Sequence, residues 1–526
     1  MNHALTVSDI VRAHARLKPH KIAVKDSNKA LTFSELNQRA SRLAAMFLNR
    51  GFKKGDRVAV LAYNRVEWPE IYIGLSRAGL IVIPINFRLT PPEIQYILEH
   101  SEAVSLIVQD SLWDKVDLIR GSIQVKSIFR LDGNQTELPS GVHSYDVSLS
   151  QENNIAVADS TQVSGEDVFA LMYTSGTTGK PKGAIRSNAG NMMIALATSL
   201  EFEFGESDTA LLVMPMCHAN SLYFMMTFLY LGATITIDDK QSFDPEDLLR
   251  TFSKDKITFT SLVPTHYIMM LGLSSEIKEK YDVSSISKLL ISSAPARKDT
   301  KLAILDYFKN SKLFELYGST EAGWVTLLRP DEQLIKLGSV GREWAGSGAI
   351  KILDADGHEV DDGEVGELFS RTSYVFEGYW KNVEKTQEAF SGEWCSVGDM
   401  ARRELDGYIY LVDRKSNMII SGGENIYPSE VENAIGSHPK VKDVAVVGVP
   451  DEKWGESVLA AVVCHVGEAL SEDELKLWCK KHLAGYKCPR HIVFIADSEM
   501  PRNATGKILH RILRDRYVSI SGAVQV

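Results

Sequence analysis

The stretch VFALMYTSGTTGKPKG, residues 168–183, joins an apolar run to a loop of glycines, hydroxyl side chains and two lysines. Residues 168–172 favour a buried strand, and the glycines that follow free the backbone to turn. Hydroxyls and exposed backbone N–H groups on such a turn can surround an anion. The stretch therefore predicts a phosphate-binding loop at the end of a strand.

This loop differs from the Walker phosphate loop, which needs four residues between its first glycine and its Gly-Lys pair and a Ser or Thr after the lysine. Here two threonines separate Gly176 from Gly179, and Pro181 follows Lys180. A flexible Ser/Gly linker is the alternative, but a linker needs neither two lysines nor a proline in so short a span. The phosphate of a small molecule is the favoured ligand.

Length and composition narrow the class of protein. A chain of 526 residues exceeds what one hydrophobic core usually supports, so we expect at least two domains. The formal net charge is -10 and there is no basic stripe, so nucleic acid is not an expected partner. The first twenty residues carry charges and histidines, and no apolar run reaches eighteen residues, so we expect neither a secretion signal nor a membrane-spanning helix.

The cysteines are five in number, dispersed and without the spacing of metal ligands. They are Cys217, Cys395, Cys464, Cys479 and Cys488. We expect reduced thiols and a cytoplasmic location, with peripheral membrane contact left open.

Short apolar runs bounded by turn residues recur along the chain, with amphipathic segments between many of them. Examples are RVAVLA near residue 57, LIVIPI near 80, KLLISSA near 288 and the amphipathic FSELNQRASRLAAMFLNR from residue 33. This alternation predicts an α/β fold, with a large multi-layer N-terminal domain of mostly parallel sheets over residues 1–413. Residues 414–526 predict a small α+β domain, in which Ser471 and Glu474 fit the capping box of a helix.

Several motifs in a fixed order resemble the adenylate-forming superfamily, which contains acyl-CoA synthetases, firefly-type luciferases and the adenylation domains of peptide synthetases. After YTSGTTGKPKG come YGSTEAG at 317–323, GELFSRTSYVFEGYW at 366–380, WCSVGDM at 394–400, DRKSNMIISGGENIYPSEVE at 413–432 and PRNATGKILH at 501–510. The resemblance extends from about residue 31 to Lys507 and so covers nearly the whole chain.

The resemblance implies roles in binding ATP and Mg²⁺. Thr320 would contact the α-phosphate, and Glu321 would hold the metal, since Mg²⁺ prefers carboxylate and phosphate oxygens. The loop would enclose the β- and γ-phosphates, and the residues after two further strands would line the nucleotide and acyl site. These residues are Thr174, Ser175, Gly176, Thr177, Thr178, Gly179, Lys180, Lys182, Ser293, Ala294, Pro295, Tyr317, Gly318 and Ser319.

Further roles fall in the last quarter of the chain. The resemblance implies that Asp399 and Arg414 bind the ribose and that Lys507 reaches the active site during adenylation. The small domain would then turn about a pivot at Ser416, where many relatives have Asp or Lys. Gly422, Gly423 and Glu424 would line the channel for the pantetheine arm of coenzyme A.

The acid substrate is expected near His218, which by resemblance flanks the acyl group. Cys217 precedes it where an aromatic residue is common, and Asn188 stands where many relatives have histidine. Acetate-specific members carry tryptophan in place of Gly318, so we expect open space and a medium- or long-chain fatty acid, with an aryl or alicyclic acid as the alternative. A dicarboxylate would need an arginine, such as Arg186 or Arg297. Apolar candidates for the lining are Tyr223, Met225, Met226, Val263 and Trp324.

The resemblance implies an ATP-dependent acid–thiol ligase that uses ATP, Mg²⁺ and coenzyme A and forms an acyl adenylate. A stand-alone adenylation enzyme that loads a carrier protein and a luciferase-type oxygenase are alternatives that start from the same intermediate. A catalytically inactive nucleotide sensor is disfavoured because the charged residues of the motifs are all present. Assembly as a homodimer is left open.

Overall fold

The computed structural model describes residues 6–132, 138–153, 155–159, 161–174, 180–292, 296–344, 346–422, 424–451, 453–502 and 508–522. It divides into two compact units. The first comprises Met1–Ile350 and Ser370–Cys395, and the second comprises Lys351–Phe369 and Ser396–Val526. Within the described ranges, no helix has the length and apolar character needed to cross a bilayer.

One sheet of the first unit has seven strands in the order β7-β6-β5-β3-β4-β8-β9. All neighbours are parallel except β8 and β9, which form a hairpin around the predicted phosphate loop. The strands are β3 (Arg57–Leu61), β4 (Ile81–Ile85), β5 (Ser105–Gln109), β6 (Ser127–Leu131), β7 (Val142–Ser144), β8 (Val168–Thr174) and β9 (Lys182–Ser187).

The other large sheet has eight strands in the order β15-β14-β13-β12-β10-β11-β1-β2. Only its two outermost pairs, β14 with β15 and β1 with β2, are antiparallel. The strands are β1 (Ile22–Lys25), β2 (Ala30–Thr32), β10 (Thr209–Leu212), β11 (Thr234–Ile237), β12 (Phe259–Leu262), β13 (Lys288–Ser292), β14 (Lys312–Ser319) and β15 (Gly323–Leu328).

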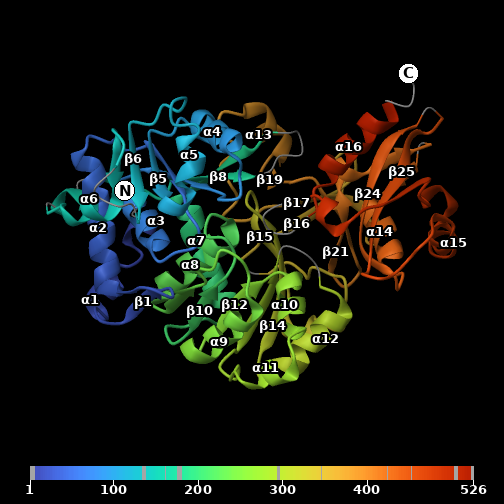
Figure 1. The fold of residues 1–526 in the computed structure, drawn as a ribbon, viewed down its shortest axis with the longest axis horizontal. Helices are drawn as coiled ribbons and strands as arrows, with labels where there is room; N and C mark the ends of the chain where they lie inside the picture. Colours follow the sequence, from blue (N-terminus) through green and yellow to red (C-terminus); the bar gives the residue numbers. More distant parts are fainter. Residues whose placement is uncertain are drawn as a thin grey trace. The chain divides into compact units, whose positions relative to one another are not determined.

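Helices cover both faces of these sheets, which gives the multi-layer arrangement seen in Figure 1. Four helices pack in the layer that both sheets share: α2 (Phe33–Asn49), α3 (Glu67–Arg77), α7 (Asn188–Glu201) and α8 (Ala219–Leu231). Helix α4 (Pro91–His100) and α5 (Trp113–Asp117) cover the outer face of the seven-stranded sheet. Helices α9 (Pro245–Asp255), α10 (Pro264–Leu271) and α12 (Lys298–Tyr307) cover the outer face of the other sheet. Shorter helices are α1 (Arg12–Leu17), α6 (Tyr145–Ser150), α11 (Ser275–Glu279) and α13 (Val383–Ala389).

Alternation along the strands explains why both faces are covered. In β3, Val58 and Val60 join the core between the sheets, whereas Ala59 and Leu61 join the outer core. Successive side chains of a strand point to opposite faces, so an apolar residue at every position requires a layer on each side. The predicted α/β class and mostly parallel sheets are confirmed.

The second unit has an antiparallel centre and two cores of its own. Its longest pair is β24 (Val441–Asp451) with β25 (Gly455–Cys464), and β26 (His491–Phe494) runs parallel to β25. The other strands of this part are β16 (Ile350–Leu353), β17 (Val365–Ser370), β20 (Asp399–Arg403), β21 (Ile409–Arg414), β22 (Ile419–Ser421) and β23 (Glu424–Ile426), while β18 (Phe390–Ser391) and β19 (Trp394–Cys395) belong to the first unit. Its helices are α14 (Pro428–Gly436), α15 (Glu472–His482) and α16 (His510–Gly522).

The start of α15 bears out half of the predicted capping box. The Ser471 hydroxyl accepts a hydrogen bond from the Glu474 backbone N–H at 3.2 Å. The Glu474 carboxylate does not reach back to the cap, because it accepts from Lys440 Nζ at 3.0 Å instead. The helix begins where the sequence predicts, but the Glu474 carboxylate pairs with Lys440 and does not complete the capping box.

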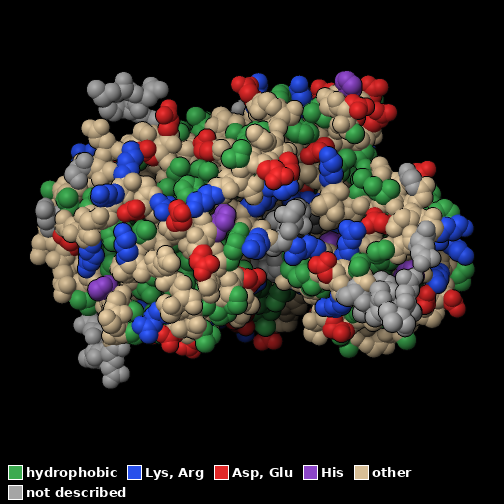
Figure 2. Space-filling view, turned by 90° about the horizontal axis from the view of Figure 1, so that it is seen from above, with side chains coloured by type: hydrophobic (Ala, Val, Ile, Leu, Met, Phe, Trp, Pro, Cys, Tyr) green, Lys and Arg blue, Asp and Glu red, His purple; other side chains and the backbone are tan. Residues whose placement is uncertain are grey.

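The surface and the cysteines agree with an ordinary globular chain. On the face shown in Figure 2, basic and acidic side chains are interspersed. All five cysteines are free thiols, as predicted. Burial raises the pKa of Cys217 to about 12, so this thiol stays protonated and unreactive.

Candidate active site

Glu321 is the centre of the predicted site in the first unit. It lies in the turn between β14 and β15 and is 7% exposed. One carboxylate oxygen, Oε1, accepts from the Thr174 hydroxyl at 3.1 Å and from the Tyr379 hydroxyl at 2.9 Å. The structure thus joins the strand end before the phosphate loop to the Thr-Glu motif, which lies 147 residues further along the chain.

The donors around Glu321 leave room for a metal. Both hydrogen bonds go to Oε1, and Oε2 accepts none among the described residues. A buried carboxylate with one oxygen fixed and the other free fits Mg²⁺, which takes oxygen ligands and keeps several from water or phosphate. Glu321 therefore satisfies the chemistry expected of the metal-binding residue.

Two lysines of the loop lie against aromatic rings. Lys182, the first residue of β9, holds its Nζ 4.0 Å from the centre of the Tyr379 ring. Lys180 Nζ is 5.3 Å from the centre of the Tyr96 ring, and the Tyr96 hydroxyl donates to the Pro181 carbonyl at 3.2 Å. Cation–π contacts of this kind stabilise a positive charge close to the loop.

The hairpin that carries Thr320 and Glu321 is built by close backbone approach. Tyr317, Gly318 and Ser319 end β14, and the Ser319 hydroxyl accepts from the Ala322 N–H at 2.9 Å. A Cβ at Gly318 would lie 2.3 Å from the Gly323 carbonyl oxygen and 3.1 Å from the Trp324 indole. An irregular register in the hairpin brings Gly323 and Trp324 over this position, so the hairpin itself fills the space beside Gly318.

Trp324, the second residue of β15, is a buried aromatic residue next to this hairpin turn. It is 5% exposed, its indole N–H donates to the Thr198 hydroxyl at 3.0 Å, and its ring packs edge-on against Tyr223 at 5.1 Å. Tyr223, Met225 and Met226 are completely buried in the core between the sheets. Three of the predicted lining residues are thus core residues, and the fourth, Trp324, packs against one of them.

Polar groups gather where β12 and β13 end. Asn220, in the first turn of α8, donates through Nδ2 to the Ser261 hydroxyl at 3.0 Å and to the Ser292 hydroxyl at 3.2 Å. The two serine hydroxyls are 3.1 Å apart. The other end of the Asn220 amide has no partner among the described residues. Ligands of open α/β sheets bind at this edge, beyond the carboxyl ends of the strands.

His218 lies immediately before α8, beside these groups. Its Nε2 is buried and has no hydrogen-bond partner within the described part of the chain. Burial, with a smaller effect of Arg88, lowers the pKa of His218 to about 4, so the ring is neutral at physiological pH. A neutral imidazole with one free nitrogen can accept or donate a single hydrogen bond to a ligand.

Asn188, which replaces a common histidine of the family, has a structural role. Its Oδ1 accepts from the Val7 N–H at 3.2 Å and from the Ser76 hydroxyl at 3.0 Å, and its Nδ2 donates to the Asp167 carbonyl at 3.1 Å. The residue is 1% exposed and hydrogen-bonded through both ends of its amide, so it ties the N-terminal segment and α3 to the start of α7.

The second unit brings together the two predicted ribose ligands. Asp399 begins β20 and Arg414 ends β21, and the two face each other across this antiparallel pair. Arg414 Nε is 2.6 Å from Asp399 Oδ1. A paired carboxylate and guanidinium present acceptors and donors side by side, as recognition of two ribose hydroxyls requires.

The predicted pivot and the pantetheine loop lie in the same unit. Ser416 is exposed, in a single turn of 3₁₀-helix over Lys415–Asn417. Gly422 has a φ of +61° and its N–H donates to the Trp454 carbonyl at 2.8 Å, while Glu424 begins β23 and is exposed. Ser175, Gly176, Thr177, Thr178, Gly179, Ser293, Ala294, Pro295, Gly423 and Lys507 lie outside the described residues.

Sequence reasoning missed two functional candidates. The sequence motifs assign no role to Tyr379, within the GYW segment, although its hydroxyl donates to Glu321. Arg186 was considered only for a dicarboxylate, yet its Nη1 donates to the Thr320 and Glu321 carbonyl oxygens at 3.3 Å each. A charged residue inside an apolar strand was the available signal for Arg186.

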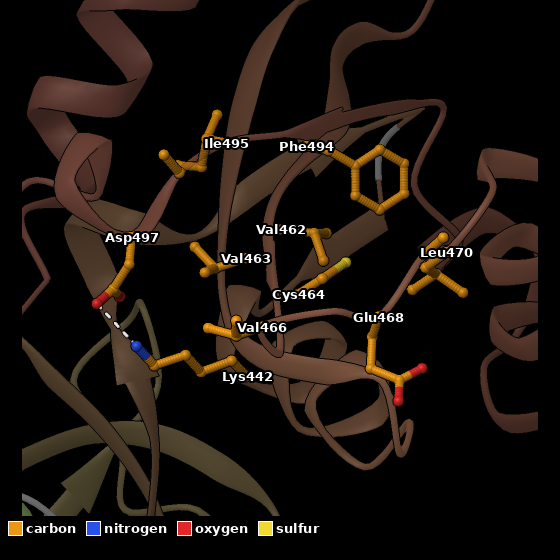
Figure 3. Close-up of a pocket in the computed structure, with 12 residues that line it drawn as sticks. Lys442, Val462, Val463, Cys464, Val466, Glu468, Leu470, Phe494, Ile495 and Asp497 are labelled. Carbon is orange, nitrogen blue, oxygen red and sulfur yellow. Dashed lines mark hydrogen bonds and ion pairs between the residues drawn. The ribbon is translucent and has the colours of Figure 1, made fainter.

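A surface pocket of about 490 Å³ lies in the second unit (Figure 3). None of the residues that line it is a predicted site residue. Its walls include Val462, Val463 and Phe494. Lys442 and Asp497, at its edge, pair with each other at 2.8 Å. The pocket lacks the convergent polar groups of a substrate site.

Comparison with known proteins agrees with this geometry. Residues 11–380 match the family model of the AMP-binding enzyme, and residues 430–507 match that of the AMP-binding enzyme C-terminal domain. A feruloyl-CoA synthase from Amycolatopsis sp is 34% identical over 96% of this chain and 97% of its own. A long-chain-fatty-acid–CoA ligase, FadD13, from Mycobacterium tuberculosis is 31% identical over 97% of this chain and 98% of its own.

Among solved structures, O-succinylbenzoate coenzyme A synthetase from Bacillus subtilis, in complex with ATP and magnesium ion, superimposes with a TM-score of 0.83 at 28% identity. The match covers 96% of this chain and 99% of that one. The motif-based prediction is confirmed: the chain belongs to the AMP-binding enzyme family, in the branch of the AMP-forming acyl-CoA ligases.

Proposed function

We propose that this enzyme activates an aromatic or other ring-containing carboxylic acid with ATP and transfers the acyl group to coenzyme A. The observation that carries the proposal is the convergence of Thr174, Tyr379 and Glu321 next to the phosphate loop. The acid class rests on the filled space at Gly318 and on the Asn220–Ser261–Ser292 cluster.

The first step makes a poor acyl donor into a good one. A carboxylate oxygen attacks the α-phosphorus of ATP, the bond to pyrophosphate breaks, and an acyl adenylate forms. In the second step the coenzyme A thiol, after loss of its proton, attacks the acyl carbonyl and expels AMP. Both reactants of the first step are anions, so the site must supply positive charge and hydrogen-bond donors more than covalent chemistry.

Particular residues meet this demand in the proposal. Lys180 and Lys182 flank the loop that would enclose the leaving phosphates, and Thr320 would donate to the α-phosphate. Mg²⁺, held at Glu321, would stabilise negative charge on the phosphate oxygens. In the second unit, Asp399 and Arg414 would hold the ribose, and Lys507 would reach the reacting groups in the first step.

The structure supports a compact acid with a polar substituent more than a plain fatty acid. Trp324 is buried within the β14–β15 hairpin, and one end of the Asn220 amide, next to two hydroxyls, has no partner among the residues that the structure describes. A site built to hydrogen-bond a hydroxyl rejects an analogue without it, since its own polar groups then stay unpaired. A medium- or long-chain fatty acid is the second candidate, and the named relatives include ligases of both kinds.

A panel of matched acids tests the proposal. Purified enzyme is incubated with ATP, Mg²⁺ and para-hydroxycinnamate, cinnamate, para-hydroxybenzoate, benzoate, octanoate, palmitate or acetate, with and without coenzyme A, while pyrophosphate, AMP and thioester are measured. We expect thioester formation that needs both the acid and coenzyme A. We also expect the hydroxylated acid of a pair to exceed its partner about tenfold or more in kcat/KM.

The outcomes separate the alternatives. Preference for octanoate or palmitate would overturn the acid class but leave the ligase activity intact. Pyrophosphate release with no thioester would point to a carrier protein as the acceptor. Asn220→Leu should abolish the preference within each hydroxylated pair while leaving the unsubstituted acids nearly unchanged, which makes each pair its own control.

A further inference from the structure

Arg186 is a charged residue at a buried position of an edge strand. It lies within β9, is 1% exposed and faces the layer between the two large sheets. Its Nη1 donates to the Thr320 and Glu321 carbonyl oxygens at 3.3 Å each. Its guanidinium carbon lies 5.5 Å from the centre of the Tyr223 ring.

The other two nitrogens of the Arg186 guanidinium group differ from Nη1 in their bonding. Nε and Nη2 are buried and lack a hydrogen-bond partner in the described part of the chain. Arg77 offers a direct comparison, because it is also 1% exposed and bonds through all three nitrogens to the Ser8 carbonyl, the Ser41 hydroxyl and both oxygens of Asn37. All three nitrogens of Arg77 are therefore hydrogen-bonded, as is typical of a buried arginine with a structural role. Two nitrogens of Arg186 are not hydrogen-bonded to any described residue.

A buried and incompletely bonded charge is costly, so stability alone does not account for Arg186. Its two hydrogen bonds from Nη1 hold the backbone of the turn that carries Thr320 and Glu321, and its guanidinium group also interacts with the Tyr223 hydroxyl. Its charge also acts on the surrounding buried groups. The pKa of Tyr223 is raised, mainly by burial. The charge of Arg186 acts to lower this pKa and the charge of Glu321 acts to raise it, so both charges act on the one hydroxyl.

We propose that Arg186 is a positioning residue for the metal-binding turn. It holds the Thr320 and Glu321 carbonyls by hydrogen bonds, so that the side chains of these residues point to the nucleotide and its Mg²⁺. This inference rests on the proposed function. The positive charge behind the turn also offsets the Glu321 carboxylate when no metal is bound. Loss of Arg186 should therefore weaken the coupling between Mg²⁺ and ATP more than it weakens binding of the acid.

Calorimetric titration of ATP, with and without Mg²⁺ and in the absence of acid, tests this directly. In the wild-type enzyme Mg²⁺ should increase the affinity for ATP. In Arg186→Met we expect this gain to fall about tenfold, with the affinity for metal-free ATP within about twofold of the wild type. Arg186→Lys keeps a donor and a charge and should restore part of the gain.

Arg77→Met is the matched control, because it removes an equally buried arginine that does not touch the turn. It should lower the thermal midpoint and leave the Mg²⁺-dependent gain unchanged. An unchanged gain in both Arg186 variants, or a loss of equal size in Arg77→Met, would overturn the proposal. So would a change confined to the KM of the acid, which would make Arg186 a substrate contact.

Arg186→Lys keeps the test decisive if Arg186→Met does not fold, since a wild-type gain in the lysine variant together with a wild-type adenylation rate contradicts a role in positioning. The binding experiment needs no turnover. A wild-type enzyme that couples Mg²⁺ to ATP but ignores every acid would refute the proposed function alone.

Discussion

At the scale of single residues, Glu321 shows how the fold prepares a carboxylate for a metal. Thr174 and Tyr379 fix one oxygen, and the other accepts no hydrogen bond among the described residues. The neutral isostere Glu321→Gln keeps the shape and removes the charge. We expect it to slow acid-dependent pyrophosphate exchange on the order of a hundredfold, as loss of one preorganised electrostatic group typically does.

Exchange measured across a range of Mg²⁺ concentrations checks this, with Glu393→Gln as the control. Glu393 is a surface residue of the same unit, and among the described residues it pairs with Arg371 alone, at 3.1 Å. Its variant should match the wild type. A Glu321→Gln enzyme with full activity at wild-type Mg²⁺ would remove Glu321 from the metal site.

His218 gives a prediction about pH. Its pKa in the folded protein is about 4, below the ordinary 6.5, because burial disfavours the charged ring. Between these two values the unfolded chain binds a proton that the folded chain does not, so the free energy of unfolding falls as the pH is lowered through this range. His218→Gln should flatten the fall, measured as the denaturant midpoint at several pH values.

His266 behaves in the same way and provides the internal comparison, since burial also lowers its pKa to about 4. Replacing either histidine should remove part of the slope, and replacing both should remove more. An imidazole signal of His218 that titrates near 6.5 in the folded enzyme would contradict the assignment.

At the scale of elements, the strands were predictable and their irregularities were not. The runs near residues 57, 80 and 288 became β3, β4 and β13, and the segment from residue 33 became α2, because apolar periodicity is a local property. The filled space at Gly318 depends instead on the register of β14 with β15, and the bond between Tyr379 and Glu321 joins residues 58 positions apart. Such contacts follow from topology, which periodicity does not encode.

The β14–β15 hairpin therefore yields a prediction about packing. Gly323 has a φ of +71°, and a Cβ there would lie 2.5 Å from the Tyr374 ring. Gly323→Ala combines left-handed backbone strain with overpacking. Gly357 also has a positive φ, of +84°, but its added Cβ would meet nothing within 4 Å.

Gly357→Ala is accordingly the control that isolates the strain, which costs about 1–2 kcal/mol. Gly323→Ala should lower the free energy of unfolding by a further ~1–3 kcal/mol through overpacking. It should also slow adenylation, because the turn with Thr320 and Glu321 shifts. Chemical unfolding and pyrophosphate exchange give the two readouts. Equal destabilisation by the two variants would contradict this prediction, because it would mean that the Tyr374 ring moves away from the added methyl group at no cost in free energy.

At the scale of the whole molecule, the second unit has what a separately moving body needs. Its sheet is covered on both faces by cores of its own, with Val444 and Val446 in one and Ala445, Val447 and Val449 in the other. A unit with its own core can keep its fold while its orientation changes. The predicted boundary after residue 413 and the pivot at Ser416 remain predictions about that motion, as do a cytoplasmic location and a homodimer.

The two-step chemistry makes this motion testable through one lysine. In the proposal Lys507 stabilises the anionic reactants of adenylation but has no task when the thiol attacks the finished adenylate. Lys507→Ala should lose acid-dependent pyrophosphate exchange by on the order of a hundredfold or more, as expected when a preorganised charge is removed. Given a synthetic acyl adenylate and coenzyme A, the same variant should form thioester at nearly the wild-type rate.

Lys480→Ala, which removes an exposed lysine from α15 of the same unit, is the control and should leave both half-reactions intact. Equal loss of both half-reactions in Lys507→Ala would mean that the lysine serves one fixed arrangement of the two units throughout. Loss of adenylation alone would mean that the second unit delivers Lys507 for the first step and that the thiol step proceeds without it. The division of the molecule into two units would then correspond to the division of the reaction into two steps.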